Sequence, residues 1–406
     1  IYMPPSVRTK THQKHTSPLR MNRDQHENGI VLTHPLSPSG DESRSDLPEE
    51  LIVEILLRLP VRSLVQFKCI CKSWKTLISD PKFVKRHLQI SSAEPNLIHL
   101  FFSQLSEPQK IVSYPLKPLF ENILPPVTSS GMMKMKNQYW IIGSCNGLLC
   151  MYNRYHHCVK LRNPSIMFKS NKSPRAVSFE WMNILYGFGF DRVNDKYKVL
   201  LVVRNKNDPN QILTRVYTFG LDSWKTIPNF QITPTGPFSL LGKFVSGNLN
   251  WIAKKRVVSV SSSQIVILIL SFDLEKETCK ELLLPQHDGD KVYGHTLYVL
   301  SSCLGVCYET NKTHWVVWLM KEYGVVESWT KFMIIPLDKF NKPPAIVIPV
   351  FVLENGAVLL VNKYTSQFVL YNLNTGELDY SLDYSLKGIS NFRHNLHICC
   401  ESLVSL

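Results

Sequence analysis

The sequence predicts a mainly β protein, in which a small module of three helices precedes a β-propeller of six blades. Three observations support this fold class. Helical periodicity is confined to residues 46–88, turn signals recur every ~8–12 residues from residue 97 onward, and one type of strand repeats about every 50 residues. The chain has 406 residues, 44% of them hydrophobic, which is enough apolar material for such a core.

Residues 46–88 carry three short helical patterns. The first begins in the segment 46–50, where Asp46 can cap the helix and two glutamates suit its positive end. It ends at Leu59-Pro60, because the residue before a proline disfavours helical backbone. Further helices are predicted over 63–70 and 71–78, and Asp80-Pro81 predicts a stop. A module of this size rarely folds alone, so we expect it to dock on the rest of the chain or on a partner.

A repeated strand type indicates the propeller rather than a sandwich or barrel. In each copy apolar and polar residues alternate, and an acidic or amide residue follows in a turn. This spacing is typical of kelch-like propellers, in which each repeat forms one blade of four strands. Unrelated hairpins with coincidental spacing are the alternative. The repeated apolar positions are Leu161, Phe219, Phe272, Trp318 and Tyr371.

The two ends of the repeat region are expected to form the sixth blade. Residues 97–148 and 392–406 are left over by the five repeats, and pairing of the first strand with the last would close the ring. Asn146-Gly147 separates two apolar runs, which is the strongest short signal for a β-hairpin. The predicted domains are a disordered tail over 1–45, the helical module over 46–88 and the propeller over 89–406.

Composition limits the compartments that we expect. The longest apolar runs, residues 265–270 and 345–353, are shorter than the ~20 residues of a membrane-spanning helix. Residues 1–40 contain no apolar block of the length that a secretory signal needs. Ten cysteines are too few for a disulfide framework in a chain of this length. We therefore expect reduced thiols and a location in the cytoplasm, the nucleus or both.

The start of the helical region resembles an F-box. The resemblance rests on Leu47-Pro48, the break at Leu59-Pro60-Val61, Leu64 and the segment Cys71-Lys72-Ser73-Trp74. The downstream chain is similar to the plant F-box-associated interaction domain, and to kelch-repeat and S-locus F-box proteins. The segments that carry this second resemblance follow the order expected in the family: 143–149, 161–164, 187–191 with 195–199, and 248–251.

The resemblance implies a substrate receptor of an SCF-type ubiquitin ligase, with no catalytic residue, cofactor or metal of its own. In that family the F-box binds a Skp-family adaptor, which bridges to a cullin, and the second domain binds a protein target for ubiquitination. Some of the implied adaptor contacts, above all Ile55 and Trp74, could instead only hold the three helices together. The implied contacts are Leu47, Pro48, Leu51, Ile52, Ile55, Leu56, Leu59, Pro60, Leu64 and Trp74.

Two other functions stay open beside this one. The protein could be an adaptor-bound scaffold whose partner is not degraded, or a propeller enzyme with a site in the central channel. The segment Gly143-Ser144-Cys145-Asn146-Gly147 fits a nucleophile elbow, but a strand follows where that site requires a helix, so we expect a hairpin turn. The run of Cys145, Cys150, His156, His157 and Cys158 lacks the paired spacing of a structural zinc site, so we expect buried thiols and a polar loop.

The net charge of +14 does not by itself indicate nucleic-acid binding. Residues 1–46 carry +1, residues 47–88 carry +4 and residues 89–406 carry +9, so we expect a spread-out charge without a focal patch, densest at Lys254-Lys255-Arg256. Proteins that bind nucleic acids gather Lys and Arg on one face among aromatic residues. We expect no nucleic-acid or membrane partner, and a surface that slightly favours an acidic target. Candidate target-binding loops lie near residues 205–211, 259–263 and 387–394.

Overall fold

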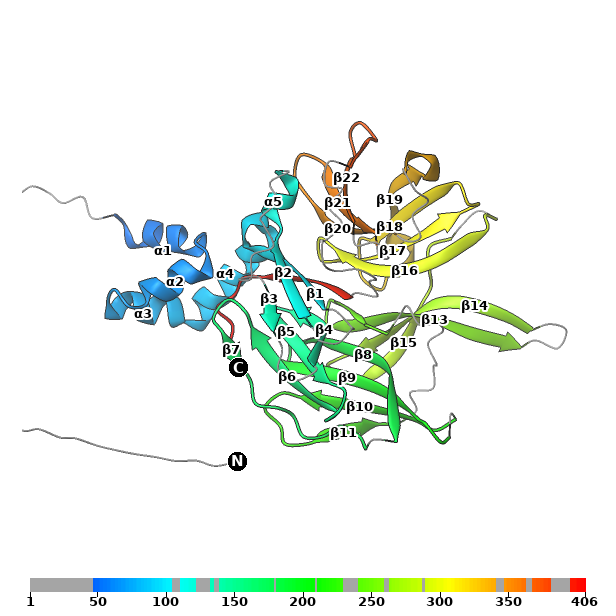
Figure 1. The fold of residues 1–406 in the computed structure, drawn as a ribbon, viewed down its shortest axis with the longest axis horizontal. Helices are drawn as coiled ribbons and strands as arrows, with labels where there is room; N and C mark the ends of the chain where they lie inside the picture. The colour runs from blue at the N-terminus through cyan, green and yellow to red at the C-terminus, as the bar shows by residue number, and fades with distance from the viewer. Residues whose placement is uncertain are drawn as a thin grey trace, which may run out of the picture. The chain divides into compact units, whose positions relative to one another are not determined.

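The computed structural model describes residues 47–103, 110–121, 132–134, 139–178, 180–208, 210–228, 240–258, 263–286, 289–340, 347–362, 367–380 and 395–406. In this part of the chain the N-terminal residues form helices and the later ones form sheets (Figure 1). The tail predicted to be disordered, residues 1–45, lies outside the described residues. No helix among the described residues is both long and apolar enough to cross a bilayer.

Four α-helices occupy residues 49–93, one more than the sequence predicts. Pro48 and Pro60 stand directly before the first two helices, and both have an extended backbone that ends the preceding segment. The three predicted helices are confirmed, each shifted by a few residues. The four helices are α1 (Glu49–Leu57), α2 (Val61–Phe67), α3 (Lys72–Ser79) and α4 (Pro81–Ala93).

The additional helix α4 begins at Asp80-Pro81, the dipeptide that was expected only to end a helix. The Asp80 carboxylate accepts hydrogen bonds from the N–H groups of Lys82 and Phe83, at 2.7 and 3.2 Å. Proline is tolerated in a first helical turn, where its missing N–H would have no intrahelical partner. The dipeptide therefore ends α3 and starts α4, and the boundary predicted after residue 88 falls inside α4.

Six sheets of four strands follow, each forming one blade of a propeller. Blade 1 contains β24 (Asn395–Cys400), β1 (Ile98–Ser103), β2 (Lys110–Pro115) and β3 (Met132–Lys134). Blade 2 contains β4 (Tyr139–Cys145), β5 (Leu148–Asn153), β6 (Cys158–Asn163) and β7 (Phe168–Lys169). Blade 3 contains β8 (Trp181–Asp191), β9 (Lys196–Asn205), β10 (Ile212–Thr218) and β11 (Trp224–Ile227).

The last three blades follow the same order. Blade 4 contains β12 (Lys243–Val245), β13 (Asn248–Val258), β14 (Ser263–Asp273) and β15 (Thr278–Leu282). Blade 5 contains β16 (Val292–Leu300), β17 (Cys303–Thr310), β18 (His314–Met320) and β19 (Trp329–Pro336). Blade 6 contains β20 (Val347–Val352), β21 (Ala357–Asn362), β22 (Phe368–Asn372) and β23 (Leu378–Asp379). Among the residues that the structure describes, the short helices are α5 (Lys117–Phe120), η1 (Pro95–Leu97), η3 (Val326–Ser328) and η4 (Leu337–Lys339).

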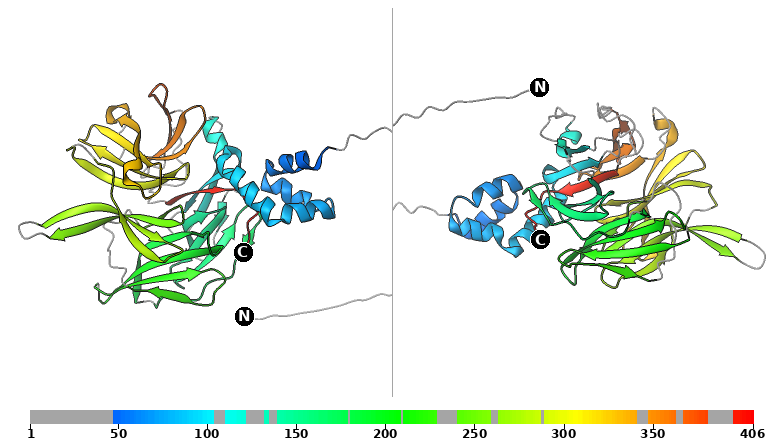
Figure 2. Two further views of the ribbon diagram at one scale, coloured as in Figure 1. Left: turned by 180° about the vertical axis from the view of Figure 1, so that it is seen from behind. Right: turned by 60° about the horizontal axis from the view of Figure 1, so that its bottom comes forward.

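The ring closes through blade 1, as the sequence predicts. The last strand, β24, pairs antiparallel with β1, with Cys400 opposite Ile98 (Figures 1 and 2, red beside cyan). Blades 1 and 6 then share a core in which Leu100 packs with Leu359 and Phe368. The predicted extent of this blade, residues 97–148, is too long, because β4 and the start of β5 belong to blade 2.

The sequence repeat corresponds to the third strand of each of blades 2–6. Leu161 lies on β6, Phe272 on β14, Trp318 on β18 and Tyr371 on β22, while Phe219 directly follows β10. The period of about 50 residues is therefore one blade of four strands. The kelch-like propeller is confirmed, and coincidental hairpins are excluded.

A glycine on β8 explains why blades 3 and 4 can approach closely. A Cβ atom at Gly187 of β8 would lie 2.5 Å from a methyl carbon of Leu249 and 2.9 Å from the Trp251 ring. Leu249 and Trp251 are buried on β13. Two of the segments that carried the family resemblance, 187–191 and 248–251, thus pack against each other across a blade interface.

Candidate adaptor-binding surface

Two apolar side chains of α1 are exposed on the same face of the helix. Leu51 and Ile55 lie four residues apart, which places them on one face, and they are 51% and 53% exposed. Neighbouring apolar side chains with this exposure are typical of a surface that a partner covers. Leu47, which precedes α1, is 53% exposed as well.

Two other predicted contacts are interior residues. Leu56 is 2% exposed and Leu64 is fully buried, and both belong to the core that also contains Val61, Ile78 and Phe83. Their position gives them a packing role within the helical module. Their assignment as adaptor contacts stays an untested prediction.

Three further predicted contacts are half-buried. Ile52, Leu59 and Trp74 pack against the same core, and the Trp74 ring centroid lies 5.2 Å from that of Phe67. The expectation that some residues only hold the helices together therefore fits Trp74. It does not fit Ile55, whose side chain is largely exposed.

The module has exposed apolar residues that were not predicted as contacts. Val65 on α2 and Ile70 after it are both exposed, as are the predicted contacts Pro48 and Pro60. Helical spacing could not separate Val65 from the buried Leu64, because which of two adjacent apolar residues faces inward depends on the packing of the other helices. The candidate surface is thus wider than the ten predicted positions.

The helical module is joined to the propeller by the end of the chain. Leu403 completes the core of the module, and Ile166 of blade 2 packs against it. Glu401 directly follows β24, and its carboxylate accepts a hydrogen bond of 2.7 Å from the backbone N–H of Val61 at the start of α2. On the surface Lys85 of α4 forms an ion pair with Asp195 of blade 3, at 3.7 Å.

Glu401 is held as a carboxylate at this junction. Burial acts to raise its pKa, but hydrogen bonds from His99 and from the Val61 N–H, with the nearby charge of His99, lower the pKa overall. The imidazole of His99 lies 3.5 Å from the Glu401 carboxylate. Because its acceptor is charged and partly buried, the hydrogen bond from the Val61 N–H is stronger than one between two neutral groups.

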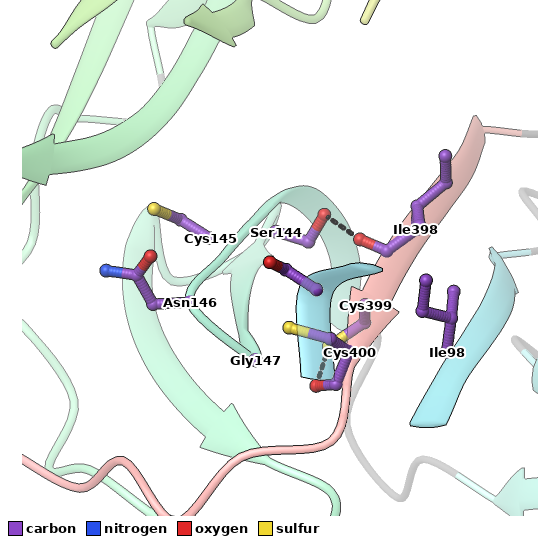
Figure 3. A pocket seen from close by; sticks show the side chains of 9 residues that line it. Ile98, Ser144, Cys145, Asn146, Gly147, Ile398, Cys399 and Cys400 are labelled. Carbon is purple, nitrogen blue, oxygen red and sulfur yellow. Dashed lines mark hydrogen bonds between the residues drawn. The ribbon is translucent and has the colours of Figure 1, made fainter. Parts of the chain in front are cut away.

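The suspected nucleophile elbow is a hairpin turn, as expected. Asn146 and Gly147 both have positive φ, 53° and 75°, and they join β4 to β5. Figure 3 shows Ser144 donating its hydroxyl hydrogen bond to the Ile398 carbonyl, at 2.7 Å. The turn borders a small cavity of about 180 Å³ that Cys145 and Cys400 also line. Burial raises the pKa of Cys145, and it raises that of Cys400 to about 11, so both are thiols at neutral pH.

The Cys and His residues of blade 2 are engaged separately. Cys150 is fully buried in the blade core, Cys158 lies 3.8 Å from the Tyr139 hydroxyl, and His157 hydrogen-bonds Tyr152 at 2.6 Å. Among the described residues, no three His, Cys, Asp or Glu side chains are placed to hold a metal ion. Of the candidate target-binding loops, 205–211 is described except for residue 209, whereas 259–262 and 387–394 lie outside the described residues.

The structure combines a propeller that its last strand closes with a helical module that packs on the residues after that strand. This combination defines the class of protein. Residues 44–86 match the F-box domain, and residues 114–406 match the F-box associated beta propeller domain. The chain therefore belongs to the F-box proteins that carry an F-box associated β-propeller.

Relatives from Arabidopsis thaliana extend over most of the chain. F-box/kelch-repeat protein At3g23880 is 32% identical over 358 residues, covering 85% of this chain and 93% of that protein. F-box protein At3g07870 is 27% identical over 400 residues, covering 86% and 90%. F-box protein CPR1 is 25% identical over 358 residues, covering 82% and 83%.

Proposed function

We propose that this protein is the substrate-recognition subunit of an SCF-type ubiquitin ligase. Its F-box binds a Skp-family adaptor, which links it to a cullin, and its propeller binds a protein target for ubiquitination. The observation that carries the proposal is the exposed apolar pair Leu51 and Ile55 on α1. We further propose that the subunit is non-catalytic and acts in the cytoplasm, the nucleus or both.

The exposed pair is not needed to build the module itself. The core of the helices is filled by Leu56, Leu57, Leu64 and Phe83, together with Leu403 from the end of the chain. Covering an exposed Leu or Ile side chain contributes on the order of 1.5–3 kcal/mol each, before the entropy of association is subtracted. Since the fold does not use this energy, it is available for binding an adaptor.

Co-purification of the full chain with a Skp-family adaptor tests the proposal. The double variant Leu51→Asp with Ile55→Asp should remove adaptor binding, because each charge would have to be buried without a partner. The matched control is Val193→Asp with Leu283→Asp, which changes two exposed apolar residues of the propeller. The control should bind the adaptor like the wild type.

Two results would contradict the proposal. One is a wild-type chain that does not bind the adaptor, and the other is a Leu51, Ile55 variant that binds it normally. A third result would instead identify a scaffold. In that case the chain binds the adaptor, but the abundance of the bound target does not change when the proteasome is blocked.

A further inference from the structure

The positive charge of the chain is concentrated in one segment, contrary to the expectation from the sequence. Between Glu121 and Glu180 there are eight Lys and Arg residues and no Asp or Glu. Six of the eight lie in residues 139–178, which form blade 2 and the segment after β7. The net charge of residues 89–406 does not reveal this local imbalance, because acidic residues elsewhere in that stretch offset part of it.

Four of these side chains gather at the outer edge of blade 2. Lys160 and Arg162 are two residues apart on β6, so they project from the same face of the sheet, and Arg162 stands opposite Lys169 of β7. The intervening residue Leu161 faces the other way and is buried. We call Lys160, Arg162, Lys169 and Lys172 the basic edge.

The segment that carries Lys169 and Lys172 is fixed along β6. The N–H groups of Ser170 and Ser173 donate to the carbonyls of Leu161 and Val159, at 3.0 and 2.8 Å. In return, the hydroxyl oxygens of these serines accept from the N–H groups of Leu161 and Val159, at 2.8 and 3.0 Å. These reciprocal bonds extend the sheet beyond β7 and hold the exposed Lys172 next to the strand.

The charges of the basic edge repel one another. The Lys160 ammonium is half-buried, 3.8 Å from the centre of the Tyr139 ring. Burial lowers its pKa, and the charges of Arg162, Lys172 and Lys169 lower it further. Among the residues that the structure describes, no ion pair joins Lys160, Lys169 or Lys172 to a carboxylate.

The densest basic run in the sequence, Lys254-Lys255-Arg256, does form an ion pair with a carboxylate. There Lys255 of β13 forms an ion pair with Glu281 of β15, two strands away in the same blade, at 2.9 Å. Part of that charge is therefore balanced within the protein. At the basic edge, a negative charge bound from outside would offset the mutual repulsion of Lys160, Lys169 and Lys172.

We propose that the basic edge binds a segment rich in Asp and Glu in the target protein. The proposal rests on the proposed function, since it specifies what the propeller recognises. A second copy of this chain does not fit, because its net charge is +14, and the chain's own residues 1–46 carry +1. Single-stranded nucleic acid is less favoured, because it stacks successive bases on exposed aromatic rings, and of Tyr139, Trp140, Tyr152 and Tyr155 in blade 2 only Tyr155 is exposed.

A labelled peptide of about a dozen residues, alternating Glu-Asp and Gly-Ser, tests the proposal with the full chain. Its binding is followed by fluorescence anisotropy at low and at physiological salt, where screening differs. The variant Lys169→Gln with Lys172→Gln removes two exposed charges of the basic edge. The control, Lys276→Gln with Lys291→Gln, removes two exposed lysines near β14 and β16 and gives the same net charge.

We expect the basic-edge variant to bind the peptide about fivefold more weakly at low salt, and the control to bind within about twofold of the wild type. Equal loss in both variants would overturn the proposal, because only net charge would then matter. Unchanged binding in the basic-edge variant would also overturn it, and the lysines would only protect the sheet edge from pairing.

Two further measurements separate this proposal from its alternatives. A single-stranded DNA of about a dozen thymidines should bind more weakly than the peptide; tighter binding that depends on Lys169 and Lys172 would overturn the assignment to a protein segment. Adaptor binding is measured in the same preparations and should be equal in all variants. If the adaptor binds but the peptide does not, the basic-edge proposal fails while the proposed function stands.

Discussion

The carboxylate of Glu401 accepts a hydrogen bond from the backbone N–H of Val61, at 2.7 Å, although 340 residues separate the two. Glu401 directly follows β24, the strand that closes the propeller, and Val61 begins the second helix of the F-box. The end of the chain thus closes the ring and also joins the F-box to it. Asn163 of blade 2 fixes the same segment by donating to the carbonyls of Ser402 and Val404, at 2.8 and 2.9 Å.

Replacing Glu401 by alanine should weaken this junction. The change removes a charged acceptor and leaves the Val61 N–H without its partner, which typically costs about 1–3 kcal/mol when the group is buried. We expect faster hydrogen exchange in α1 and α2, with little change in blades 3–5, measured by mass spectrometry. Glu275→Ala is the control, because that side chain is exposed in a turn of blade 4. Unaltered exchange in the two helices would show that the packing of Leu403 and Ile166 holds the junction without this hydrogen bond.

A buried ion cluster between blades 3 and 4 should make the propeller sensitive to acid. Lys198 lies 2.9 Å from Asp191 and 3.1 Å from Glu277, and its ammonium also donates to the Leu274 carbonyl at 2.6 Å. Burial acts to raise the pKa values of Asp191 and Glu277. For Asp191, hydrogen bonds from Asn194 and Lys198 and the charge of Lys198 lower the pKa overall. For Glu277, hydrogen bonds from Lys225 and Lys198 and the charges of both lysines lower the pKa overall.

A carboxyl group with a lowered pKa in the folded state stabilises the fold above its ordinary pKa and loses that contribution as the pH falls. The ordinary values are 3.8 and 4.5, so the free energy of unfolding should begin to fall below about pH 5 and continue to fall toward pH 3. Lys198→Met should lower it by about 3 kcal/mol at pH 7, because it leaves a buried carboxylate without its partner.

Urea unfolding at pH 7 and pH 4 provides the measurement for both effects. The control is Lys225→Met, because Lys225 also pairs with Glu277 but is exposed. An exposed pair contributes about 0–1 kcal/mol, so this variant should stay close to the wild type. Equal destabilisation by the two substitutions would mean that the burial of Lys198 adds nothing to the stability that the ion cluster contributes.

Close packing at Gly187 can be tested by a double-mutant cycle. Gly187→Ala places a methyl group 2.5 Å from Leu249, and such overpacking typically costs about 1–3 kcal/mol. Leu249→Ala alone leaves a cavity, which costs about 2–5 kcal/mol. Because the smaller residue makes room for the methyl group, the double variant should be less destabilised than the sum of the two. Strict additivity in urea unfolding would show that the two residues do not collide.

The propeller could be predicted from the sequence because its signals are local and repeated. Positions such as Leu161 and Trp318 recur once per blade, so the spacing reports the architecture directly. The closure by β24 follows from the residues left over. The contact between Val61 and Glu401 could not be predicted, because no local pattern relates residues so distant in the chain.

The candidate surface was predicted only in part for a similar reason. Leu51 and Ile55 form one apolar stripe of α1, and Ile52 and Leu56 form another. Both stripes satisfy helical periodicity. The stripe of Ile52 and Leu56 faces inward, because Phe83 of α4 and Leu403 complete the core on that side of α1. Neither α4 nor the packing of Leu403 was predicted from the sequence, so the exposed stripe could not be distinguished from the buried one.

The helix start at Asp80 should be required for α4. Asp80→Ala removes the acceptor for the N–H groups of Lys82 and Phe83, and the loss of such a cap typically costs about 0.5–2 kcal/mol. Asp80→Asn keeps a capping oxygen and is the matched control, so it should retain most of the stability. Thermal unfolding and hydrogen exchange in the first turn of α4 measure the effect. If alanine and asparagine destabilise the chain equally, the lost negative charge matters rather than the cap.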